Sequence, residues 1–188
     1  MTTGANRQVV STSKREQSRE QMKVLRSYLG VSDSPDEYHP KVDGSCEWIE
    51  GRDDFQDWID CSGHLFIKDD SENGEKKSLA IFWAHANPGT GKTVLASHIV
   101  CLLQELQQEC AFYYFHVGDK TSRSFGPFLR SIAYQLATSN SAIRDKLFQL
   151  SQEGSTFDMD DSWTIWKKVF RKGIFQARYP SQRLFQHF

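Results

Sequence analysis

The order of elements in this 188-residue sequence predicts an α/β fold with a parallel sheet. A continuous apolar run over residues 79–84 is typical of a strand that is buried on both faces. A turn rich in Gly and Pro follows it, and a helical pattern over 93–108 comes directly after the turn. A second, aromatic-rich run covers 110–117, and a further helical pattern covers 125–137. Strand, turn, helix, strand and helix in this order are typical of a parallel α/β unit.

The residues before this unit predict a helical and loop-rich segment. Residues 1–30 read as a polar tail followed by a helix, whose apolar residues recur at helical spacing: Met22, Leu25 and Leu29. In residues 31–78 acidic groups outnumber basic groups by 14 to 5, which favours a solvated, loop-rich connector. This connector contains one short helix, predicted from three apolar residues on one face: Phe55, Trp58 and Ile59. Beyond the second strand, further helices are predicted over 141–150 and 162–170.

Composition excludes several classes of function. The net charge is −1, from 23 basic and 24 acidic residues, which argues against a general binder of nucleic acid or of an anionic membrane. No apolar run approaches the roughly 20 residues that a membrane span needs, and the polar first 30 residues do not resemble a secretory signal. We therefore expect a cytoplasmic protein with no membrane partner. The basic cluster within 167–172 is interpreted as a solvated helix face rather than a nucleic-acid patch.

Cysteine and histidine spacing does not indicate a metal site. The four cysteines contain no C-x-x-C pair, so reduced, buried thiols are expected. The six histidines also show no ligand spacing, and His98, on the apolar stripe of the helix over 93–108, is expected to be a packed core residue.

The turn after the first predicted strand carries the main chemical signal. It fits the phosphate-loop pattern G-x-x-x-x-G-K-[ST], with alanine at the first position: Ala86, Asn87, Pro88, Gly89, Thr90, Gly91, Lys92 and Thr93. A triphosphate is held by convergent backbone N–H groups, and glycines allow the chain to curl around it. Lys92 is positioned to bridge the β- and γ-phosphates, and the Thr93 hydroxyl to ligate Mg²⁺. A Gly-rich turn that binds nothing is the alternative, but the flanking strand and helix favour the phosphate loop.

Several landmarks between Tyr28 and Tyr179 resemble the start of a NACHT-type signalling NTPase, of the nephrocystin-3-like N-terminal kind abundant in filamentous fungi. The run from Gly44 to Ile49, with Phe55 and Trp58 after it, resembles the G-[ST]-C-E-W segment of that family. The run from Ala86 to Leu95 resembles its phosphate loop. Two further runs resemble its aromatic second strand and the next helix: Phe112–Phe115 and Leu129–Leu136.

The resemblance implies a P-loop NTPase fold whose first part covers 79–180, inside a larger signal-transduction protein. It implies binding of ATP or GTP with Mg²⁺ by the residues from Ala86 to Val94, with Thr93 as the metal ligand. Nucleotide state in this family controls oligomerisation, so a second copy or a full-length NACHT protein is the expected partner.

One departure from the family concerns the acidic strand that positions Mg²⁺ and the attacking water. In the family this strand comes soon after a segment like 174–180, whereas here the atypical tail 181–188 follows. Asp158, Asp160 and Asp161 have no strand before them. We therefore expect a truncated or degenerate member with an incomplete sheet and no catalytic residues, so that its status as an enzyme stays open. The alternative function is a non-catalytic interaction module that binds no nucleotide.

Overall fold

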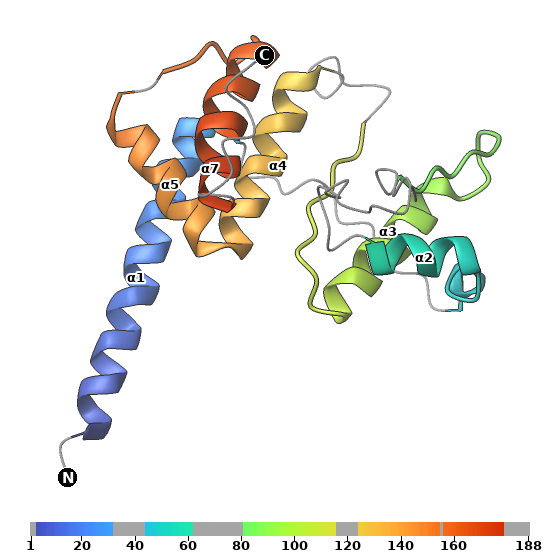
Figure 1. Cartoon of the computed structure of the whole chain (residues 1–188), viewed down its shortest axis with the longest axis horizontal. Coiled ribbons are helices and arrows are strands. Elements are labelled where there is room, and N and C mark those ends of the chain that lie inside the picture. The colour runs from blue at the N-terminus through green and yellow to red at the C-terminus, as the bar shows by residue number, and fades with distance from the viewer. Residues whose placement is uncertain (1–2, 32–43, 62–80, 116–123, 155, 179–188) are drawn as a thin grey trace, which may run out of the picture. The chain divides into compact units, whose positions relative to one another are not determined.

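The computed structural model describes residues 3–31, 44–61, 81–115, 124–154 and 156–178, with side chains from residue 12 onward except that of Cys61. In this part of the chain every regular element is helical (Figure 1). In chain order the elements are α1 (Thr3–Leu29), the 3₁₀ helix η1 (Glu47–Ile49), α2 (Asp53–Cys61), α3 (Lys92–Glu105), α4 (Phe125–Ser139), α5 (Ser141–Gln152), α6 (Ser162–Ile165), the π-helix η2 (Trp166–Ile174) and α7 (Phe175–Arg178).

The predicted α/β fold with an incomplete parallel sheet is therefore wrong, because the regular elements within the described residues are helices and none is a strand. Residues 81–84 of the first predicted strand have no regular secondary structure, and neither do 110–115 of the second; the remaining residues of both runs lie outside the described part. A strand needs a neighbouring strand that takes up its backbone hydrogen bonds, and among the described residues neither run is paired with one.

The apolar content of these two runs serves packing against helices instead. Among the described residues of the first run, 81–84, only Phe82 is half-buried, whereas Ile81 and Trp83 are 71% and 81% exposed. In the second run Tyr113 packs on Phe128 of α4, with ring centroids 5.6 Å apart. A short apolar run alone does not distinguish these arrangements from a sheet strand.

The chain divides into two compact units, which are described separately. One consists of Met1–Glu37 with Glu109–Phe188, and the other of Tyr38–Gln108.

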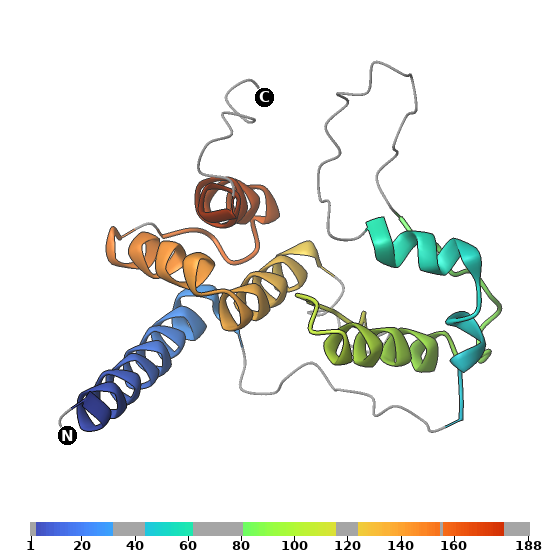
Figure 2. The ribbon, with the colours of Figure 1, turned by 60° about the horizontal axis from the view of Figure 1, so that its bottom comes forward.

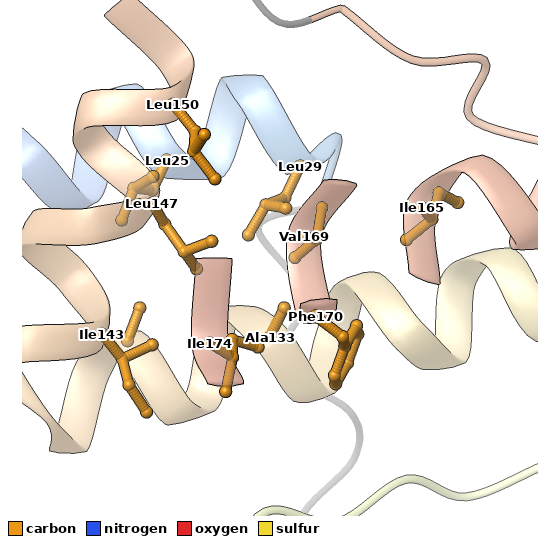
Figure 3. Packing of buried hydrophobic residues seen from close by; sticks show 11 residues of the cluster. Leu25, Leu29, Ala133, Ile143, Leu147, Leu150, Ile165, Val169, Phe170 and Ile174 are labelled. Carbon is orange, nitrogen blue, oxygen red and sulfur yellow. The ribbon is translucent and has the colours of Figure 1, made fainter. Parts of the chain in front are cut away.

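The first unit is a bundle in which α1, α4, α5 and η2 surround one apolar core (Figures 1 and 3). Its buried side chains come from these four helices and from the short helix α6: Leu25, Leu29, Ala133, Ala137, Ile143, Leu147, Leu150, Ile165, Val169, Phe170 and Ile174. α1 begins at Thr3, ten residues before the periodic pattern that predicted it, because its first turns carry no apolar stripe. The other helices predicted in this unit lie within α4, α5 and the stretch from α6 to α7.

Side chains determine where the helices of this unit begin and end. The Asn140 carboxamide oxygen accepts from the N–H groups of Ala142 and Ile143 at the start of α5. At the end of α1, Nη1 of Arg130 donates to the carbonyl oxygens of Leu29 and Gly30, at 3.2 and 3.3 Å. A cation at a helix C-terminus is favourable because the carbonyl ends carry partial negative charge.

The second unit contains η1, α2, α3 and the non-helical residues 81–91, which lead into α3 (Figure 2). Its small core consists of Ile49, Phe55 and Ile59, with five half-buried side chains packed against it: Trp58, Phe82, Leu95, Ile99 and Leu102. This core connects α2 and α3, and it positions the candidate site at the start of α3.

Candidate functional site

The predicted phosphate loop begins in the non-helical residues before α3 and ends in the first turn of α3. Gly89 and Gly91 have φ angles of 80° and 86°, in the left-handed region that residues with a Cβ rarely adopt. A Cβ placed on either glycine would meet no atom within 4 Å. Glycine is therefore required here by the backbone conformation rather than by crowding, and the space beside the loop is open.

Lys92 closes this loop on itself. Its Nζ donates to the carbonyl oxygens of Ala86, at 2.8 Å, and of Asn87, at 2.7 Å. The Thr90 hydroxyl donates to the same Asn87 oxygen at 2.8 Å. The structure thus brings together Ala86, Asn87, Thr90 and Lys92, all of them exposed to solvent.

The first turn of α3 supplies backbone donors beside the Lys92 ammonium. The first N–H with a partner one helical turn back is that of Leu95, which donates to the Gly91 oxygen at 2.9 Å. The N–H groups of the preceding three helical residues point out of the helix end, where the positive end of the helix dipole also lies. Thr93 is exposed in this turn and Val94 is half-buried. Backbone donors, a lysine ammonium and a hydroxyl are the groups that bind a phosphate and its metal ion.

A buried polar contact lies one and a half turns further along α3. His98 is 1% exposed, and its Nε2 lies 2.8 Å from Oε1 of Glu50, next to η1. The interpretation of His98 as a packed core residue is confirmed, but the sequence analysis missed its partner Glu50. The sequence did indicate that a partner exists, because a histidine on a buried apolar stripe needs a hydrogen-bond partner.

The described residues contain no group of three or more His, Cys, Asp or Glu side chains that would hold a metal ion. Cys46, Cys101 and Cys110 are not joined by disulfides, and burial raises the pKa of the Cys110 thiol. The fourth cysteine lies where side chains are not described.

The acidic residues near α6 take part in local structure. The Asp161 carboxylate accepts from the backbone N–H groups of Trp163 and Thr164 and caps α6. Hydrogen bonds from Thr164, chiefly from its hydroxyl, lower the pKa of Asp161. Asp158 accepts from the N–H of Asp160 in the turn before this helix.

Comparison with known families decides the family. The profile of the family described as "Nephrocystin 3, N-terminal" matches residues 44–185. The chain belongs to the nephrocystin-3 N-terminal family. No curated protein and no solved structure matches this nephrocystin-3 N-terminal chain. The resemblance to that family is thereby confirmed, and the matched range contains the predicted phosphate loop, all of α3 and the Glu50–His98 contact.

Among the helices that the structure describes in this nephrocystin-3 N-terminal chain, none combines the length and the hydropathy that crossing a membrane would require.

Proposed function

We propose that the residues from Ala86 to Val94 bind the phosphates of a nucleoside triphosphate, ATP or GTP, together with Mg²⁺. The observation that carries this proposal is the Lys92 ammonium, which lies on the carbonyl oxygens of Ala86 and Asn87 beside the open N-terminal end of α3. Family membership supports it, because the matched range includes this loop.

Binding would exchange one set of Lys92 hydrogen bonds for another. In the closed loop the ammonium donates to two neutral carbonyl groups. A phosphate bound at the helix N-terminus offers anionic oxygens instead, so the ammonium would gain the attraction between opposite charges in addition to its hydrogen bonds. The N–H groups of the first turn would donate to the same phosphates, and the Thr93 hydroxyl would ligate Mg²⁺.

The proposed role is regulatory, as part of a NACHT-type signalling protein. Nucleotide bound at the loop would control association with a second copy of the chain or with a full-length NACHT protein. We expect no nucleotide hydrolysis by this chain alone, because Asp158 and Asp161 accept hydrogen bonds in a turn and in a helix cap.

The decisive test is equilibrium binding of a fluorescent, non-hydrolysable ATP or GTP analogue to the full chain in the presence of Mg²⁺. Lys92→Ala is expected to weaken binding by about tenfold or more, because it removes a charge-assisted contact. Lys172→Ala, an exposed lysine of η2, is the matched control and should bind like the wild type. Equal binding by the wild type and Lys92→Ala would remove the assignment.

A phosphate-release assay tests the regulatory role. We expect no release above background from the purified chain. Turnover that disappears in Lys92→Ala would instead make the chain a hydrolase.

The second candidate is an interaction module that binds no nucleotide. Exposed apolar side chains in the second unit favour it: Trp48, Ile81 and Trp83 are 61%, 71% and 81% exposed. This candidate predicts that the wild type ignores nucleotide and that Trp83→Ser reduces self-association in light scattering.

A further inference from the structure

Both sides of the phosphate loop are attached to one segment, residues 45–61, which comprises η1 and α2. Before the loop, Phe82 packs on Phe55 and Trp58 of α2, with ring centroids 5.4 and 5.9 Å apart. After the loop, three side chains of α3 pack against the same small core: Leu95, Ile99 and Leu102. The 45–61 segment therefore contacts residues both before and after the loop, and all of them belong to a single unit.

The apolar contacts determine the rotation of α3 about its axis only through the face that they bury. Leu95, Ile99 and Leu102 form one stripe, and hydrophobic packing, which is non-directional, leaves room for small rotations of that face. The hydrogen bond between His98 and Glu50 is directional, because it requires a short distance and near-linear geometry. His98 lies six residues after Lys92, which is about 9 Å along a helix. A rotation of α3 would therefore move the Lys92 side chain with it.

Each partner of this contact is itself constrained. His98 is 1% exposed, and its Nδ1 is buried without a hydrogen-bond partner. The Glu50 carboxylate only accepts hydrogen bonds, so the contact places a proton on Nε2 of His98, which donates to Glu50. The backbone of Glu50 is tied to α2, because Gln56 Nε2 donates to the Glu50 carbonyl oxygen at 2.7 Å.

On the basis of the proposed function, we propose that Glu50 and His98 are positioning residues for the phosphate loop. Their hydrogen bond aligns α3 against the 45–61 segment and so directs the Lys92 ammonium and the first N–H groups of α3 toward the phosphate position. The two residues act through α3 and do not touch the nucleotide. The 45–61 segment then affects nucleotide affinity from outside the loop.

Nucleotide binding provides the first test, with variants of Glu50 in the full chain and the fluorescent analogue with Mg²⁺. Glu50→Ala removes the acceptor and should weaken binding by about tenfold, as expected when a buried donor loses its partner. Glu50→Gln keeps an acceptor oxygen for the Nε2–H group and should stay within about twofold of the wild type. Glu47→Ala, an exposed carboxylate in η1, should have no effect. Wild-type affinity in Glu50→Ala would overturn the proposal.

A second test needs no ligand and separates this proposal from the proposed function. Backbone hydrogen exchange at residues 92–95 should be faster in Glu50→Ala than in the wild type and in Glu50→Gln. The ¹⁵N spectrum of the His98 ring should show the proton on Nε2 in the wild type. If the wild type binds no nucleotide, the proposed function fails, while faster exchange in Glu50→Ala still supports the positioning of α3. Unchanged exchange overturns the positioning whether or not nucleotide binds.

Leu102→Ala distinguishes positioning from a general loss of stability. Leu102 belongs to the same core but lies at the end of α3 far from the loop. Its truncation should lower the unfolding midpoint in urea and leave the affinity of the folded protein within about twofold of the wild type. If Leu102→Ala weakens binding as strongly as Glu50→Ala, the effect comes from stability and the positioning role is overturned.

Discussion

The side-chain amide of Gln135 bonds to both backbone polar groups of Phe112. Gln135 Oε1 accepts from the Phe112 N–H at 3.1 Å, and Gln135 Nε2 donates to the Phe112 carbonyl oxygen at 2.8 Å. A neighbouring strand would offer the same donor and acceptor pair. A helix side chain thus replaces a strand partner for part of the second predicted strand.

Gln135→Leu should destabilise the first unit. The substitution keeps the apolar contacts and leaves the half-buried backbone groups of Phe112 without this partner, which costs about 1–3 kcal/mol of unfolding free energy. Gln135→Glu should give an intermediate loss, because a carboxylate accepts from the N–H but does not donate to the carbonyl. Urea unfolding measures both changes. Gln149→Ala, at an exposed glutamine of α5, is the control, and an equal loss in that variant would contradict the role of Gln135.

Gly173→Ala should destabilise the packing of η2 on α5. A Cβ at this position would lie 2.5 Å from Cδ2 of Leu147 and 3.2 Å from Cδ1 of Leu150. Overpacking of this kind costs about 1–3 kcal/mol of unfolding free energy. In a double-mutant cycle Leu147→Ala should relieve part of the loss, since it removes the atoms that clash. Additive effects of the two substitutions in thermal unfolding would show that the close approach is unimportant.

Gly91→Ala should disturb the predicted phosphate loop through backbone strain alone. The φ angle of 86° costs a residue with a Cβ about 1–2 kcal/mol, although no atom lies near the new Cβ. Gly91→Asn should cost less, because asparagine tolerates the left-handed region better. Gly51→Ala, at a glycine outside the left-handed region, is the control. Circular dichroism with urea unfolding measures the three variants, and equal losses at Gly51 and Gly91 would contradict the argument.

The cap of α6 by Asp161 should give stability that depends on pH. Hydrogen bonds from Thr164 lower the pKa of this carboxyl in the folded protein. The stabilisation is therefore fully present above the unfolded value of about 3.9 and is lost as the pH falls through the lower folded value. Asp161→Asn keeps a capping oxygen but does not titrate, so its urea midpoint should fall less than that of the wild type between pH 6 and pH 2. Asp57→Asn, inside α2, should follow the wild type, and identical pH profiles for all three proteins would contradict the prediction.

The helices show where sequence reasoning was sufficient. Met22, Leu25 and Leu29 predicted the part of α1 that packs into the bundle, and the helices predicted over 125–137 and 141–150 lie within α4 and α5. Periodicity failed for the polar start of α1, which has no stripe to detect. It also failed beyond residue 170, where the chain continues through η2 and α7 to Arg178.

Part of the candidate site could be predicted from the sequence, and part could not. The spacing of Gly89, Gly91 and Lys92 located the loop from the sequence, because the required backbone conformations and the helix start are local properties. The contact between Glu50 and His98 joins residues 48 positions apart, and no local pattern predicts which carboxylate meets a buried histidine.

By itself, the amino-acid sequence determined the local features: the helix stripes, the glycine-dependent loop and the family to which the chain belongs. Only the tertiary structure decided how the aromatic runs are used. Phe82 and Phe112 would belong to strands if neighbouring strands took up the backbone hydrogen bonds of their runs. In the run over 110–115, the Gln135 side chain takes up those of Phe112 instead. Hydrogen-bond partners distant in the sequence are selected by the packed fold as a whole, so a local apolar pattern does not encode them.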